Sequence, residues 1–175
     1  MLAYGHIPDV LGNPDLNNLG DRAGALAAFR KAAEVGRRLH EADRSDQRAA
    51  SDYGIVLSRV EGAMDDSNPP EKLAVQRESL RVLDEAFRIS PDNVSLHIYR
   101  GLVHLHQGDT LCRAGTLEDA GRAYLQWAAI AEPYLKRGHT AFVVMFLRAN
   151  QGLALNAVAR GRPSHALAFA DRVRQ

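Results

Sequence analysis

Three histidines that lie close together in the sequence are the first residues that could do chemistry. His97, His104 and His106 fall within one apolar stretch, and imidazole is both a common metal ligand and a common general base. On a helix, positions 97 and 104 share a face two turns apart, while position 106 lies nearly opposite position 104. We therefore expect surface or groove histidines and no metal site.

The other candidates for catalysis have simpler structural explanations. Glu118 and Asp119 are adjacent acids, but adjacent helix residues point about 100° apart, and acids in a first turn stabilise the helix dipole. Cys112 is the only cysteine, which excludes an internal disulfide, and the sequence shows no partner that would activate its thiol. We expect no catalytic residue and no cofactor.

One segment concentrates basic residues and interrupts them with acids. Its arginines are Arg37, Arg38, Arg44 and Arg48. A solvated helix face is the main interpretation, and recognition of an acidic peptide or a phosphate is the alternative.

Composition indicates a soluble globular chain. The 175 residues are 46% hydrophobic and 25% charged, and a net charge of +1 gives no electrostatic case for binding nucleic acid or an anionic membrane. The start of the chain does not resemble a secretory signal, and the most apolar run, 141–147, is far shorter than the roughly 20 residues that span a bilayer. We expect a cytoplasmic protein without membrane insertion, in which this run is a buried helix or, alternatively, a buried strand.

Two sets of segments alternate along the chain. Glycines that open an apolar stretch recur about every 50 residues, at Gly5, Gly54, Gly101 and Gly152. Each is followed by a second segment that combines small and bulky residues three or four apart: Ala25/Phe29/Ala32, Ser79/Leu83/Ala86, Ala120/Tyr124/Trp127 and Ala166/Ala170. Stacked helical hairpins require this alternation, because each hairpin buries one face against the next.

Apolar residues at helical spacing, with turn residues between them, predict eight helices and no strand. The expected ranges are 1–11, 22–41, 47–64, 71–89, 94–107 or slightly beyond, 117–136, 140–159, and 163 to the C-terminus.

The second set of segments resembles the tetratricopeptide repeat (TPR) family, which carries an Ala-x3-aromatic-x2-Ala signature in its second helix. Ala25, Phe29 and Ala32 match it fully, and 79–86 followed by Pro91 matches with Ser and Leu substituted. The repeat here is nearer about 47 residues than the family's 34. The resemblance implies an all-α fold: a right-handed, TPR-like α-solenoid of about 3.5–4 antiparallel helical hairpins, forming a single domain over 1–175.

A narrower resemblance covers Tyr4 to Ala32, which looks like the start of the repeat arrays that follow the catalytic domain in some bacterial serine/threonine protein kinases. The kinase motifs themselves are not present in this sequence. The resemblance implies a non-catalytic fragment of a longer chain. The final helix is apolar and has no polar capping helix after it. This pattern also predicts a fragment of a longer chain, or else self-association through exposed terminal repeats.

In TPR arrays the first helix of each pair lines the concave surface, so the resemblance implies partner-binding residues beside the glycines. In this sequence they are Arg48, Ser51, Ser58, Arg59, Ile98, His106 and Asn156.

We therefore expect a non-catalytic scaffold that presents a concave helical surface to a protein or peptide partner. The alternative is a ligand- or signal-sensing regulatory domain of a bacterial serine/threonine kinase. An independent enzyme with a histidine-centred site is a third possibility.

Overall fold

A computed structural model describes residues 8–12 and 17–172, and the chain divides into two compact units, Met1–Tyr99 and Arg100–Gln175. The helices are α2 (Arg22–Ala42), α3 (Gln47–Ala63), α4 (Pro69–Ile89), α5 (Val94–Arg113), α6 (Leu117–Leu135), the 3₁₀ turn η1 (Thr140–Phe142), α7 (Val143–Ala159) and α8 (Pro163–Asp171). Residues 8–12 are also helical.

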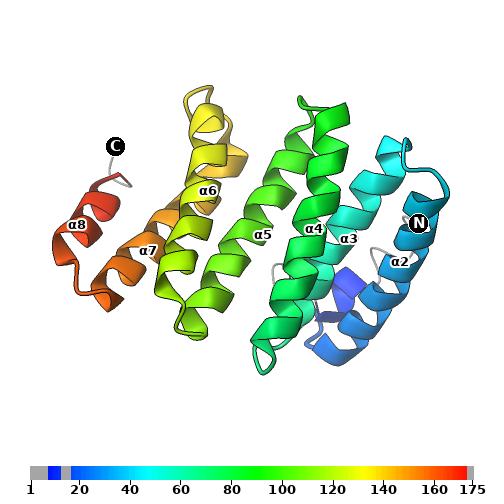
Figure 1. The fold of residues 1–175 in the computed structure, drawn as a ribbon, viewed down its shortest axis with the longest axis horizontal. Coiled ribbons are helices and arrows are strands. Elements are labelled where there is room, and N and C mark those ends of the chain that lie inside the picture. The colour runs from blue at the N-terminus through cyan, green and yellow to red at the C-terminus, as the bar shows by residue number, and fades with distance from the viewer. Residues whose placement is uncertain (1–7, 13–16, 173–175) are drawn as a thin grey trace. The chain divides into compact units, whose positions relative to one another are not determined.

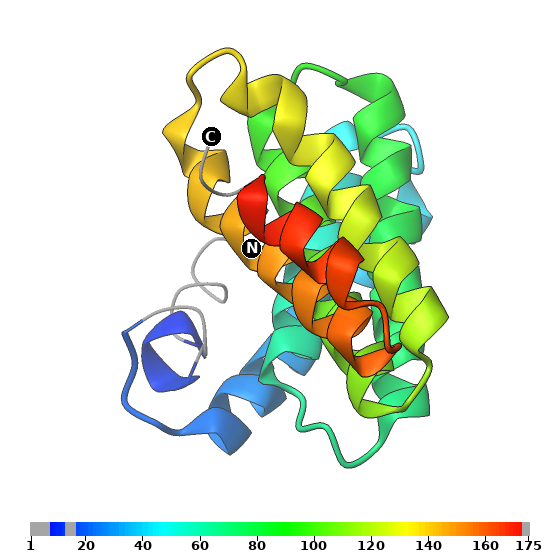
Figure 2. The same cartoon turned by 90° about the vertical axis from the view of Figure 1, so that its left-hand side faces the viewer.

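Helices that follow one another in sequence pack together within each unit. In the first unit α3 lies between α2 and α4, and in the second α7 packs against both α6 and α8. Figure 1 shows these neighbours side by side, and Figure 2 shows α8 lying along α7. The part of the chain that the structure describes contains no strand, so the predicted all-α class built from helical hairpins is confirmed. The first predicted helix and Gly5 lie largely or wholly outside the described residues.

Side-chain caps explain where the helices of the first unit begin. The Asp21 carboxylate accepts a hydrogen bond from the Gly24 amide at 2.8 Å, and Asp46 accepts from the amides of Arg48 and Ala49. These amides belong to the first turn, whose donors have no partner inside the helix. Gly20, with φ +82°, turns the chain immediately before α2.

Two cations from neighbouring helices cap the other end of α3. The Arg22 guanidinium donates to the carbonyls of Ala63 and Met64 at 3.0 and 2.8 Å, and buried Lys72 donates to the Met64 carbonyl at 3.1 Å. The last turn of α3 contains no basic residue of its own. Charge-assisted hydrogen bonds therefore tie the first turns of α2 and α4 to the C-terminal end of α3.

In the first unit, the glycine of one helix receives a bulky side chain of the next. A Cβ added at Gly54 would lie 2.7 Å from Cγ of Leu83, well inside van der Waals contact. Ser79 stands where the TPR signature has Ala, and its hydroxyl donates to the Gly54 carbonyl at 2.9 Å. The segment 79–86, in which Ser and Leu replace residues of the signature, thus packs closely on α3 and adds a hydrogen bond to it.

The second unit repeats this arrangement with aromatic rings. A Cβ at Gly101 would overlap the indole of Trp127, and Cβ atoms at Gly108 and Gly152 would press on the ring of Tyr124. Trp127 is fully buried and stacks on Phe142, with ring centroids 5.9 Å apart. The glycines therefore let α5 and α7 approach the aromatic face of α6.

Two local predictions need correction. Helix α5 continues to Arg113, further past Gln107 than expected. Gly108 does not end the helix but lies within it, where its backbone packs against the Tyr124 ring, and the turn comes at 114–116. The run 141–147 is helical, as expected, but not buried throughout: Phe142 is fully buried, whereas Val144 is 64% exposed.

By length and composition alone, one described stretch, Thr140–Ala159, could cross a membrane, with a mean hydropathy of 1.3. The core helix of a soluble protein can pass the same test, and α7 packs against α6 and α8. This single helix does not indicate membrane insertion.

The glycine contacts lead to a stability prediction. Gly101→Ala should lower the free energy of unfolding by about 3 kcal/mol, because overpacking against the buried indole outweighs the better helix propensity of alanine. Urea denaturation measures the loss. The control is Gly121→Ala in α6, where the new Cβ would lie 3.3 Å from the nearest side-chain atom, Oδ1 of Asn156, and overlap no ring. Equal effects of the two substitutions would contradict the packing argument.

Candidate functional site

A cleft of about 460 Å³ opens between α5 and α7, with α6 beneath it; we call it the α5–α7 cleft. Its lining residues come from these three helices: Leu105, Asp109, Cys112, Arg113, Leu117, Tyr124, Arg148, Gln151, Gly152, Leu155 and Ala159. All of them belong to the second unit. Apolar and charged side chains therefore share one concave surface.

Tyr124 contributes the buried ring at the base of this cleft. Its hydroxyl donates to Oδ1 of Asp109 at 2.6 Å, and its ring lies against Gly108 and Gly152. Burial, and then the hydrogen bond to the Asp109 carboxylate, hold the pKa of Tyr124 far above its usual value of 10.0. The tyrosine therefore stays a protonated hydrogen-bond donor well into the alkaline range.

Helix α7 presents apolar side chains to solvent beside the cleft. We call Val144, Leu147, Leu155 and Val158 the α7 stripe. Their successive spacings of three, eight and three residues keep them on one helix face, and Leu155 also lines the cleft. Leu155 and Val158 are 64% and 59% exposed. Because four exposed apolar side chains are contiguous with a cleft, this surface has the character of an interaction site.

The residues predicted beside the glycines are divided between the two units. In the first unit, Arg48 is exposed and Ser51 is half-buried on α3, and Ile98 is half-buried on α5. Arg59 lies 3.4 Å from the Asp9 carboxylate. Ser58 is buried and donates its hydroxyl proton to the Ile55 carbonyl. Their role in binding a partner stays a prediction.

The other two predicted residues belong to the second unit. His106 is half-buried on α5. Asn156 is buried on α7, and its amide donates to the Leu117 carbonyl at 2.7 Å, with Sγ of Cys112 3.5 Å away. Asn156 thus ties α7 to the start of α6. It also lines a second cleft, between α6 and α8.

Sequence reasoning missed the residues that give the α5–α7 cleft its character, Asp109, Arg148 and Leu155. A signal was present, since Asp109 follows Gly108, and positions 148 and 155 lie one turn on either side of Gly152. However, of the residues about one turn from a glycine, some line the cleft and others pack against the neighbouring helix. The spacing alone does not tell the cleft side, with Leu155, from the packed side, with Asn156.

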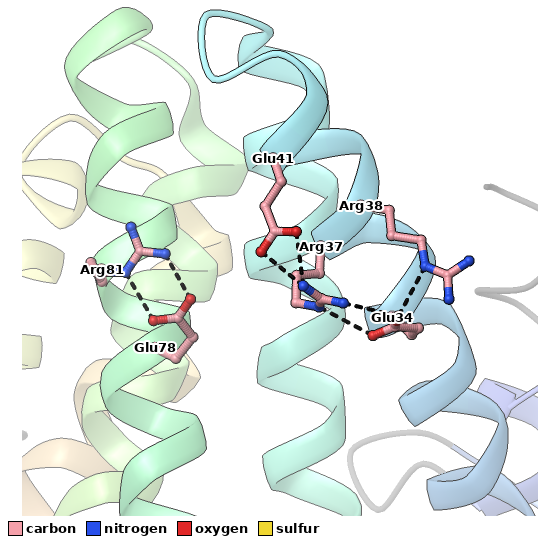
Figure 3. Close-up of polar contacts among 6 residues, drawn as sticks. All are labelled: Glu34, Arg37, Arg38, Glu41, Glu78 and Arg81. Atoms are coloured by element: carbon pink, nitrogen blue, oxygen red, sulfur yellow. Dashed lines mark hydrogen bonds and ion pairs between the residues drawn. The ribbon is translucent and has the colours of Figure 1, made fainter.

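Two of the arginines predicted as a solvated face, Arg37 and Arg38, form ion pairs within α2 (Figure 3). Arg37 contacts Glu34 and Glu41 at 3.0 and 2.8 Å, and Arg38 contacts Glu34 at 2.9 Å. Hydrogen bonds from Arg37 and then Arg38 lower the pKa of Glu34. Because Arg37 and Arg38 already have carboxylate partners, they have little unpaired charge to offer an acidic ligand. Arg44, in the turn after α2, and Arg48, on α3, are exposed.

The histidine and acid candidates also have structural partners. A ring nitrogen of His97 lies 2.9 Å from the Pro91 carbonyl, and its ring meets Phe87 edge-on at 4.6 Å. Arg122 pairs with Asp119 and, at 3.6 Å, with Glu118, both in the first turn of α6. Within residues 8–12 and 17–172, no group of three His, Cys, Asp or Glu side chains is placed to hold a metal ion.

Comparison with known proteins adds little. No family model matches this chain, and no curated protein matches it. Among solved structures, the crystal structure of MamA is similar over 88% of this chain and 87% of that chain, with 16% sequence identity and a TM-score of 0.37. A likeness at this TM-score carries no argument about function.

The Tyr124 environment predicts a pH dependence. The folded pKa lies above the unfolded value, so this stabilisation is complete below pH 10.0 and is lost as pH rises toward the folded value. The free energy of unfolding should therefore fall more steeply above about pH 10 in the wild type than in Tyr124→Phe, which has no phenol to ionise. Urea denaturation across this range tests the difference. Parallel curves would contradict the assignment.

Proposed function

We propose that this chain is a non-enzymatic interaction module that binds a protein segment on the α7 stripe and in the adjoining α5–α7 cleft. The observation that carries the proposal is the continuity of the two: Leu155 belongs to both, and the stripe leaves large apolar side chains in water. Covering them with a partner is favourable by about 25 cal/mol for each Å² of apolar surface removed from water.

The shape and charge of the site favour an acidic amphipathic helix as the bound segment. A stripe of apolar side chains on one helix face beside a groove suits a partner helix that offers apolar side chains at helical spacing. Arg148 is exposed between Leu147 and Leu155, and among the described residues it has no carboxylate partner. Residues 100–175 contain ten Lys and Arg against five Asp and Glu. A partner with carboxylates beside its apolar face would complement this charge.

The polar groups of the cleft support binding in preference to catalysis. Tyr124 is held protonated and its hydroxyl is bonded to Asp109, so that carboxylate already has a donor. The Cys112 thiol accepts a hydrogen bond from the Asn156 amide at 3.5 Å, and this amide cannot remove a proton from it. Tyr124, Asp109 and Cys112 therefore shape the wall of the cleft and offer a bound segment no activated nucleophile.

A regulatory domain attached to a bacterial serine/threonine kinase, acting in the cytoplasm, would use the same surface. It would differ in one measurable respect, because binding would then change the activity of the attached kinase.

Selection from a displayed library of helical peptides tests the proposal. The enriched peptides should share apolar residues at helical spacing flanked by Asp or Glu, and Leu155→Asp should weaken their binding by at least about tenfold through a buried unpaired charge. Arg148→Glu should also weaken it, through repulsion of the peptide carboxylates. Titration calorimetry gives the dissociation constants.

The matched control is Leu39→Asp, which changes an exposed leucine (49%) on α2 in the first unit. This variant should bind the peptides as the wild type does. Unchanged binding by both Leu155→Asp and Arg148→Glu would place the site elsewhere.

A further inference from the structure

The second unit has another cleft, of about 290 Å³, on the side of α7 that faces α6 and α8; we call it the α6–α8 cleft. Its lining residues come from these three helices and the turn before α8: Glu118, Gly121, Arg122, Leu125, Leu153, Asn156, Ala157, Arg160, Arg162, His165 and Phe169. None of these residues lines the α5–α7 cleft.

Small residues at the base of this cleft leave room for polar groups above them. Gly121 has no side chain, and a Cβ there would lie 3.3 Å from Oδ1 of Asn156 and 3.8 Å from Nη1 of Arg160. The Arg160 guanidinium therefore reaches from the end of α7 across to α6. Ala157, one turn before it, adds only a methyl group to the wall.

The charges around the cleft are not balanced. Arg122 already pairs with Glu118 and Asp119, so the single carboxylate that lines the cleft, Glu118, is shared with it. Arg160 and Arg162 have no carboxylate partner in the described part of the chain. Two guanidinium groups in one small cleft repel each other unless an anion lies between them.

We propose that the α6–α8 cleft binds a phosphoryl group, held by Arg160 and Arg162 with His165 as a further donor. Guanidinium groups present planar pairs of N–H donors that match the oxygens of a phosphate. A phosphoryl dianion offers three or more acceptor oxygens and compensates both arginines, which one carboxylate does not. Gly121 and Ala157 add little bulk to the part of the cleft wall that α6 and α7 form.

This site is independent of the protein-binding role proposed above. It uses different side chains on the other side of α7, and its chemistry is that of anion recognition and not of apolar docking. Failure of either proposal leaves the other standing.

The test is titration of the whole chain with inorganic phosphate at constant ionic strength, followed by calorimetry. The wild type should bind phosphate saturably, and Arg160→Gln and Arg162→Gln should each weaken binding by about tenfold or more. The charge-matched control is Arg137→Gln, an exposed arginine of the same unit whose guanidinium lies over the Tyr134 ring, outside the cleft. It should bind phosphate as the wild type does.

A serine-phosphorylated peptide and its unphosphorylated form distinguish the source of the group. Tighter binding of the phosphopeptide than of inorganic phosphate assigns the site to phosphorylated protein, and equal or weaker binding assigns it to a free phosphate compound. Circular dichroism verifies that each variant is folded. Absence of saturable phosphate binding by the wild type, or equal losses in Arg137→Gln and the two cleft variants, would overturn the proposal.

Discussion

Contact between a helix backbone at glycine and a large side chain of a neighbouring helix is the constraint on which the packing of both units depends. Leu83 occupies the space above Gly54 in the first unit, and Trp127 and Tyr124 occupy the corresponding spaces in the second. Interiors are packed so closely that a single added carbon at such a point must displace a ring or a helix. The glycines therefore fix how near consecutive helices approach.

The clefts of the second unit follow from this packing. Tyr124 fills the space between Gly108 and Gly152, so α5 and α7 lie against α6 and leave a groove between them above the ring. Helix α7 then has two different environments. One side adjoins the apolar stripe and the α5–α7 cleft, and the other carries Arg160 beside α6 and α8. One helix can thus serve two surfaces of different chemistry.

Much of the fold was predictable, because hairpin stacking leaves a local record in the sequence. The alternation of glycine and small/bulky segments identified the hairpins, and the turn residues between apolar stretches marked where the helices end. The site was less predictable. Whether a residue beside a glycine faces a cleft or the interior depends on the angle at which two helices cross, and neighbouring residues in sequence do not encode that angle. Asn156, predicted as a groove residue, instead uses its amide to hold the start of α6.

The most direct test of the central claim is a double-mutant cycle between Gly152 and Tyr124, measured by urea denaturation. If the glycine is required because the ring occupies its side-chain space, Gly152→Ala should be costly alone and nearly harmless in Tyr124→Ala, with a coupling energy of about 1–3 kcal/mol. Additive costs would show that the ring and the glycine act independently, and would contradict this account of the packing and of the cleft above it.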